Sequence, residues 1–117
     1  LPLTDETENM ANAAFFDLMK PGSLFVNVGR GALVDEAALL AALDAGRLAQ
    51  AYLDVVREEP LSPENAIWQH PLITLTPHIS ALTPQSGLRT DQVFLTNLER
   101  FLAGKPLKNE VPKDVFA

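Results

Sequence analysis

Three short apolar runs stand out along the chain and are expected to form strands, the first two of them buried. They cover residues 24–28, 48–55 and 72–75, and the first is rich in β-branched and aromatic residues. Polar residues, glycine and proline separate the runs, which is typical of elements joined by loops. The order strand, helix, strand, turn, strand predicts consecutive parallel strands joined by right-handed crossovers.

Helical periodicity marks three of the stretches between and after these runs. Asn12 is expected to cap a short first helix, and Asp35 a second one that Gly46 ends. Thr83 is expected to cap a long third helix, which has proline at its first position and stops at Gly104. The expected buried faces are Phe15, Leu18 and Met19 in the first helix and Leu39, Leu40 and Leu43 in the second. Alternating strands and helices predict the α/β class.

The composition narrows the class of protein. At 117 residues the chain forms one domain at most, and a content of 47% hydrophobic and 21% charged residues is globular. The absence of cysteine excludes disulfides, thiolate nucleophiles and cysteine metal sites, and it fits a cytoplasmic protein. The net charge of −6 argues against nucleic-acid binding, and no apolar run is long enough to span a membrane. No pair of histidines has the spacing of metal ligands, so we expect no metal site.

Three strand ends carry side chains suited to catalysis. Arg30 follows the first strand between two glycines, and His78 follows the third strand. Asp54 lies at the end of the second strand, with Glu59 after it. Open parallel sheets bind ligands outside the carboxyl ends of their strands. An arginine there can grip a carboxylate through two parallel hydrogen bonds, and a histidine paired with a carboxylate can act as a general acid.

Each of these side chains also has a structural interpretation, which the residues alone leave open. Arg30 would form a surface ion pair with Asp35 or Glu36. The aspartate would be a turn or capping residue, the glutamate part of a solvated loop, and the histidine a hydrogen-bonded structural residue. His70, the other histidine, lies in a turn and is interpreted as structural.

A series of motifs covers nearly the whole chain, from Leu1 to about Val111. They are Leu1-Pro2-Leu3-Thr4, Met19-Lys20-Pro21-Gly22, Val26-Asn27-Val28-Gly29-Arg30-Gly31, Val34-Asp35-Glu36-Ala37-Ala38-Leu39, Leu53-Asp54-Val55, Glu59-Pro60-Leu61 and Thr76-Pro77-His78-Ile79. In this order and spacing they resemble the C-terminal portion of the D-isomer-specific 2-hydroxyacid dehydrogenases, the family of D-lactate, glycerate, phosphoglycerate and glyoxylate/hydroxypyruvate reductases.

The resemblance implies a catalytic site and a cofactor site. The family's catalytic arginine falls on Arg30, its glutamate on Glu59 and its acid/base histidine on His78. The implied cofactor is NAD or NADP, and the implied substrate is a small 2-oxo or 2-hydroxy acid. The implied cofactor-facing residues are Leu1, Pro2, Val28, Gly29, Arg30, Asp54, His78 and Ser80.

Departures from the family pattern favour one branch of the family. Two other classes of protein are the alternatives. Gly29 stands where alanine or another small residue is usual, and residues 79–83 lack a glycine that many members have. This missing glycine, together with the stretch Trp68-Gln69-His70-Pro71, makes the chain look closer to the glyoxylate/hydroxypyruvate reductases. A formate dehydrogenase-like enzyme typically has glutamine at the position of Glu59. A non-catalytic scaffold, similar to the transcriptional corepressors of this superfamily, need not keep arginine, glutamate and histidine together.

The family's glycine-rich phosphate loop does not occur in these residues. We therefore expect residues 1–82 to be the second half of a Rossmann-type NAD(P)-binding domain, with its flanking helices. Residues 83–117 are expected to be the crossover helix and tail that return to the substrate domain. The chain is expected to be a fragment, inactive by itself, of a cytoplasmic homodimeric enzyme, and to leave an unpaired edge on its first strand.

Overall fold

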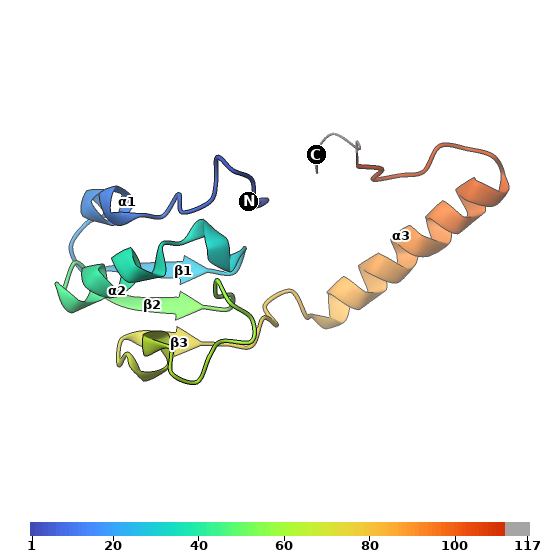
Figure 1. Cartoon of the computed structure of the whole chain (residues 1–117). Helices are drawn as coiled ribbons and strands as arrows, with labels where there is room; N and C mark the ends of the chain where they lie inside the picture. The colour runs from blue at the N-terminus through green and yellow to red at the C-terminus, as the bar shows by residue number, and fades with distance from the viewer. Residues whose placement is uncertain (112–117) are drawn as a thin grey trace. The chain divides into compact units, whose positions relative to one another are not determined.

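The computed structural model of the protein describes residues 1–111, and the chain divides after Ser80 into two compact units. The first unit holds a three-stranded parallel sheet in the order β1 (Ser23–Asn27), β2 (Leu48–Leu53) and β3 (Ile73–Leu75). The three arrows point in the same direction in Figure 1. The predicted α/β class with consecutive parallel strands is confirmed.

The strand ends differ slightly from the prediction. β1 lies one residue earlier than the predicted run, and β2 ends at Leu53 rather than at Val55. The reason is the register, because Leu53 pairs with Asn27 on one side and with Leu75 on the other. Both partners are the last residues of their strands. Beyond this level all three strands continue as loops, so the loops begin together at one edge of the sheet.

Only one face of the sheet is covered within the first unit. Phe25, Ala51 and Leu53 face the helices and join the hydrophobic core. Leu24 and Val26 point to the opposite face, where each is 58% exposed. Because successive side chains of a strand alternate between faces, β1 is half-buried here, and the expectation of a fully buried first strand is wrong for this unit.

The first helix buries Phe16, which is not among the three residues predicted for its buried face. α1 (Ala13–Leu18) inserts Phe16 into the core, where its ring meets Phe25 edge-on at 5.2 Å between centroids. Of the predicted stripe, Leu18 and Phe15 are exposed, at 89% and 40%, and only Met19 is partly buried against the core. A helix of 6 residues presents fewer than two turns, so one well-placed ring decides its orientation rather than a stripe.

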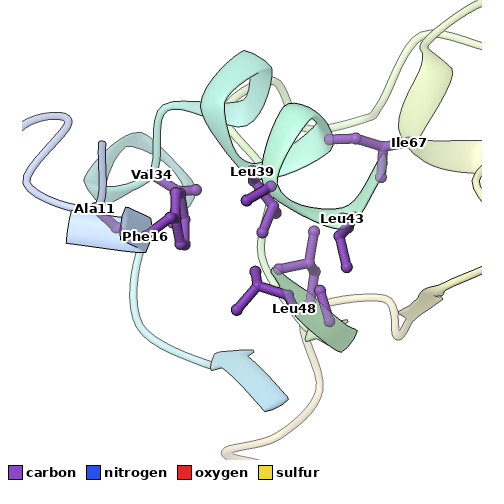
Figure 2. Close-up of a cluster of buried hydrophobic side chains, with 10 residues drawn as sticks. Ala11, Phe16, Val34, Leu39, Leu43, Leu48 and Ile67 are labelled. Atoms are coloured by element: carbon purple, nitrogen blue, oxygen red, sulfur yellow. The ribbon is translucent and has the colours of Figure 1, made fainter. Parts of the chain in front are cut away.

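The second helix covers the sheet. α2 (Glu36–Asp44) begins as predicted, with the Asp35 carboxylate accepting the Ala38 N–H at 3.1 Å. Leu39 and Leu43 are fully buried. Figure 2 shows both of them in the core cluster that also contains Phe16, Leu48 and Ile67. Leu40, which was also expected inside, is only half-buried because it lies at the rim of the buried face.

Two turns of 3-10 helix complete the first unit. η1 (Gly31–Leu33) links β1 to α2, and η2 (Ala66–Gln69) lies in the connection from β2 to β3. The Asn65 side chain caps η2 by accepting the Ile67 N–H at 2.9 Å, and Ile67 is buried in the core.

The second unit contains α3 (Pro84–Leu102). Its start matches the prediction, since Thr83 and Ser86 form a capping box in which each side chain bonds the other's backbone N–H at 3.0 Å. None of its residues is buried within the described chain. Its exposed apolar side chains are Leu88, Val93, Phe94, Leu95, Leu98, Phe101 and Leu102. No helix in residues 1–111 combines the length and the apolar character that crossing a bilayer would require.

The functional division at residue 82 stays a prediction. It assigns residues 1–82 to the cofactor-binding domain and residues 83–117 to the return to the substrate domain. Residues 112–117, at the end of the second part, lie outside the described residues.

Replacing Gly87 by alanine should stabilise α3. Gly87 lies inside the helix, and an added Cβ would meet no atom within 4 Å. Because a helix interior is less stable with glycine than with alanine by about 0.8–1 kcal/mol, we expect a gain of that order. The measurement is a urea titration followed by the helical circular dichroism signal, and an earlier loss of helix in the variant would contradict the prediction.

Candidate active site

The candidate residues gather where the strands end. Arg30 lies three residues after β1, Asp54 directly after β2 and His78 three residues after β3. Since the strands are parallel, their carboxyl ends share one edge of the sheet. The edge therefore carries a cation, a carboxylate and an imidazole on three neighbouring loops of the first unit.

His78 and Glu59 form a direct pair. The imidazole Nδ1 lies 2.8 Å from Glu59 Oε2, and the other carboxylate oxygen accepts the Val56 N–H at 3.2 Å. An ionised carboxylate can only accept, so Nδ1 carries the proton in this contact and Nε2 is left for another partner. Nε2 has no hydrogen bond within residues 1–111. The side chains are 50% and 40% exposed, so the pair is open to a ligand and to water.

The hydrogen bond from the imidazole changes the acidity of the glutamate. It lowers the pKa of Glu59 below the ordinary value of 4.5, with a smaller contribution from the Val56 N–H. Glu59 is consequently ionised throughout the neutral range. The ionised carboxylate is the acceptor that keeps the proton on Nδ1 and orients the ring.

Asp54 organises the loop that carries His78. Its carboxylate is buried and accepts hydrogen bonds from the Thr76 hydroxyl, the Ile79 N–H at 3.0 Å and the Ser80 N–H at 2.9 Å. The hydroxyl of Thr76, and then the contacts with Ser80 and Ile79, hold the pKa of Asp54 far below its ordinary value of 3.8. The aspartate is thus ionised at neutral and mildly acidic pH, and it anchors the loop after β3.

The backbone of His78 is in an unusual conformation. Its φ is +53°, in the left-handed region that residues other than glycine occupy rarely. The His78 N–H donates to the Asp54 carbonyl at 2.9 Å. Such a conformation costs about 1–3 kcal/mol and persists where surrounding contacts hold it. Here the contacts come from the backbone and carboxylate of Asp54.

Acid should destabilise the chain partly through Asp54. Above its ordinary pKa of 3.8, Asp54 is ionised in both the folded and the unfolded chain. Because its folded pKa is lower, the unfolded chain takes up the proton first, and stability is lost as the pH falls below about 4. Asp54→Asn cannot titrate, so its free energy of unfolding should fall less than that of the parent between about pH 5 and pH 3. Urea titrations at both values measure this difference, and equal losses would contradict it.

Arg30 does not form the surface pair that its structural interpretation requires. The guanidinium donates to the Gly29 carbonyl at 2.8 Å and is exposed. Asp35 caps α2 instead, and the Glu36 carboxylate accepts the Arg57 N–H at 2.7 Å. Arg30 makes no salt bridge within residues 1–111. Its charge is therefore available to an anionic ligand.

Sequence reasoning overlooked Asn27 and Trp68. Asn27 is a buried polar residue at the end of β1, and its side chain bonds the backbone of the Arg30 loop. The only signal was a single amide inside an apolar run. Trp68 belongs to the wall of a cavity of about 390 Å³ beside the histidine pair. The cavity is lined by Asp54, Val56, Glu59, Pro60, Leu61, Trp68, Leu75, Thr76, Pro77 and His78.

His70 lies at the opposite edge of the sheet, just before β3 begins. Its Nε2 contacts the Asp44 carboxylate at 3.2 Å, and its Nδ1 accepts the Leu72 N–H at 3.3 Å. These contacts agree with the structural interpretation. In the part of the chain that the structure describes, no group of histidine and acidic side chains is arranged to hold a metal ion.

Comparison with known proteins decides the family. The model for the NAD binding domain of the D-isomer specific 2-hydroxyacid dehydrogenases matches residues 1–80. The chain belongs to this family. Its predicted membership is confirmed, and the matched domain is one that binds the predicted class of cofactor.

Curated members of the dehydrogenase family align with almost the entire chain. It is 40% identical over 114 residues to glyoxylate/hydroxypyruvate reductase A of Salmonella choleraesuis. It is 41% identical over 115 residues to the glyoxylate reductase of Aeropyrum pernix. The alignments cover 97% and 98% of this chain but 36% and 34% of the relatives. The chain thus spans about a third of the length of the curated relatives it matches.

A solved dehydrogenase structure has the same fold. The NADPH-dependent glyoxylate/hydroxypyruvate reductase of Sinorhizobium meliloti, in complex with NADP and sulfate, superposes with a TM-score of 0.84 at 39% identity. The match covers 97% of this chain and 37% of that one. The Rossmann-type architecture predicted for the sheet is confirmed.

The donors and acceptors at the strand ends fit the nicotinamide cofactor of the dehydrogenase family. Asp54 places a carboxylate at the end of β2, where it accepts from Thr76, Ile79 and Ser80, and a carboxylate is the kind of group that accepts a carboxamide N–H. Val28 is exposed directly after β1, and Ser80 ends the loop that Asp54 holds. Leu1 and Pro2 lie in an exposed segment, where the Pro2 carbonyl accepts the Thr7 hydroxyl. Their cofactor contacts stay predictions.

Proposed function

We propose that the chain supplies the proton-donating and carboxylate-binding side of an NAD(P)-dependent reductase. The enzyme, of the length of the relatives, would reduce a small 2-oxo acid of the glyoxylate or hydroxypyruvate type to the D-2-hydroxy acid. The observation that carries the proposal is the 2.8 Å pair of His78 and Glu59 at the carboxyl edge of the sheet. That pair occurs in a chain of the D-2-hydroxyacid dehydrogenase family. The loop after β1, at the same edge of the sheet, carries Arg30, which has no salt bridge within residues 1–111.

Arg30 is proposed to bind the substrate carboxylate. A guanidinium can form two parallel hydrogen bonds to a carboxylate, which fixes both the position and the rotation of a small oxo acid. The bound acid would have its C2 carbonyl directed to the histidine loop. Support comes from the absence of any salt bridge to Arg30 within residues 1–111.

His78 is proposed to be the proton donor. When bound, the nicotinamide cofactor supplies the hydride that is added to C2. The proton on Nε2 of the imidazolium passes to the carbonyl oxygen, which becomes the hydroxyl group, and His78 is left neutral. Glu59 keeps Nδ1 protonated and the ring oriented. Since the imidazole is half exposed, water can return the lost proton.

An assay of the complete enzyme tests the proposal. Loss of NADH or NADPH absorbance is measured with glyoxylate, hydroxypyruvate or pyruvate as the oxo acid. We expect oxidation of the cofactor with at least one acid, and the chirality of the product identifies it as the D-isomer. No loss with any acid and either cofactor would contradict the reductase and favour a non-catalytic scaffold. Both cofactors are tested because the predicted choice is NAD or NADP.

We further propose a homodimer in the cytoplasm that binds no nucleic acid. Support for the compartment is the complete lack of cysteine, which is compatible with reducing conditions. The net charge of −6 disfavours contact with phosphate backbones. Sedimentation of the complete enzyme at two concentrations tests the dimer, and a single monomeric species at both would contradict it.

A further inference from the structure

Two buried polar side chains stand at matching places in the fold. Within residues 1–111, Asn27 and Asp54 are the polar or charged residues that are buried, with 7% and 5% exposure. Asn27 is the last residue of β1, and Asp54 directly follows β2. Asn27 precedes the loop that carries Arg30, and Asp54 contacts the loop that carries His78. Burial of a polar group is unfavourable unless its hydrogen bonds are satisfied, so the partners of these two residues show what they do.

Asn27 uses both ends of its amide on the Arg30 loop. Its Oδ1 accepts the Gly29 N–H at 3.0 Å, and its Nδ2 donates to the Arg30 carbonyl, also at 3.0 Å. The backbone on both sides of the Cα of Arg30 is thereby tied to one buried side chain. A side chain that donates and accepts within three residues closes a tight turn.

Asp54 does the same for the His78 loop. Its carboxylate accepts from Ile79 and Ser80, the two residues that follow the histidine, and from Thr76, which precedes it. Its carbonyl accepts the N–H of His78 itself at 2.9 Å. The loop is therefore held on both sides of the imidazole-bearing residue.

The two residues are joined to each other by the backbone. The Asp54 N–H donates to the Asn27 carbonyl at 2.9 Å. A continuous line of hydrogen bonds thus runs from the Arg30 loop through Asn27 and Asp54 to the His78 loop. Arg30 and His78 have no hydrogen bond to each other in the described residues, so this line is a hydrogen-bonded connection between their loops.

We propose that Asn27 and Asp54 are a pair of positioning residues that fix the guanidinium of Arg30 and the imidazole of His78 relative to one another. The proposal rests on the proposed function for the roles of those two groups. A 2-oxo acid must contact both at once, with its carboxylate on one and its carbonyl oxygen on the other. A displacement of about 1 Å between the groups would therefore reduce turnover by about 10²-fold.

Kinetics of variants of the complete enzyme test this role. Asn27→Ala removes both contacts with the Arg30 loop, and Asn27→Asp keeps the acceptor for Gly29 while losing the donor. Asp54→Asn keeps the size of the side chain but places an amide where the Ser80 N–H needs an acceptor. We expect each to lower kcat/KM for the oxo acid by about 10²-fold, and Asn27→Asp by less than Asn27→Ala.

Matched controls separate positioning from a general loss of stability. Asn12→Ala removes an asparagine cap from α1, whose side chain accepts the Phe15 N–H at 3.2 Å. Asp44→Asn changes an aspartate at the opposite edge of the sheet, where it contacts His70. Both controls should keep kcat/KM within about twofold of the parent. Losses in Asn27→Ala and Asp54→Asn no larger than in the controls would overturn the proposal.

The double variant Asn27→Ala/Asp54→Asn tests whether the two residues act as a unit. If both serve one alignment, losing the second adds little after the first, so the combined fold-loss should be well below the product of the single losses. A fold-loss in the double variant equal to the product of the two single losses would show that the two residues hold their loops independently, and it would overturn the proposed pairing.

A readout without catalysis keeps the inference separate from the proposed function. Amide hydrogen exchange of the 117-residue chain is followed by NMR at Gly29, Ile79 and Ser80. Asn27→Ala should speed exchange by about tenfold or more at Gly29 and also at Ser80 in the other loop, because the line through Asp54 is disturbed. Exchange that changes at Gly29 alone would overturn the link. If the parent enzyme is inactive but Asn27→Ala speeds exchange at both Gly29 and Ser80, the proposed reductase function is rejected and the coupling between the two loops is retained.

Discussion

Replacing His78 by glutamine should lower kcat for the reduction of the oxo acid by about 10²- to 10⁴-fold, the usual contribution of a general acid. Glutamine retains a polar group of similar reach but cannot carry a proton to the carbonyl oxygen. The oxo acid should still bind, because the proposed carboxylate ligand is Arg30. We therefore expect KM to change far less than kcat. Steady-state kinetics with saturating cofactor measure both.

The other histidine provides the control for this experiment. His70→Gln removes an imidazole that contacts Asp44 at the far edge of the sheet, so kcat should stay within about twofold of the parent. Glu59→Gln should fall between the two variants, since the imidazole is still present but loses the carboxylate that accepts from Nδ1 and orients the ring. A His78→Gln enzyme with near-parental kcat would reject the proton-donor role.

Gly31→Ala should have the largest effect on stability. A Cβ built on Gly31 would lie 1.9 Å from the carbonyl carbon and oxygen of Val56 and 2.4 Å from the Arg57 nitrogen. All three atoms belong to the backbone, so no side-chain rotation can relieve the overlap. We expect the free energy of unfolding to fall by about 3 kcal/mol, at the upper end of the usual cost of overpacking.

A neighbouring glycine is a matched control. At Gly29 the nearest atoms to an added Cβ would be Asn27 Oδ1 at 3.5 Å and Leu33 Cδ1 at 3.6 Å, which are ordinary contacts. Gly29→Ala should therefore change the free energy of unfolding by about 0.5 kcal/mol or less. Urea titrations of both variants decide the point. Equal midpoints for Gly31→Ala and Gly29→Ala would show that the close approach to Val56 does not constrain the fold.

The two glycines show how far local sequence patterns reach. Both flank Arg30, and both could be interpreted as giving a ligand access to the backbone. Only the folded chain separates them, because Gly31 is pressed against a segment 25 residues away in the sequence whereas Gly29 is not. The folded chain also decides which residue of α1 is buried. The apolar stripe of the helix predicts Leu18 inside, but the ring of Phe16 takes that place beside Phe25. The periodicity shows only which residues of the helix are apolar. It does not fix the orientation of so short a helix, which is set by packing against its neighbours.

By itself the sequence determined the α/β class, the parallel order of the strands, the caps at Asp35 and Thr83, and the family, because periodicity, capping residues and ordered motifs are local properties of a chain. Tertiary structure alone decided that Glu59 meets His78, that Asp54 holds the turn after β3, and that the Asp54 N–H donates to the carbonyl of Asn27. These contacts join residues from three strand ends. Their geometry depends on strand register and loop path, which no single stretch of the sequence encodes.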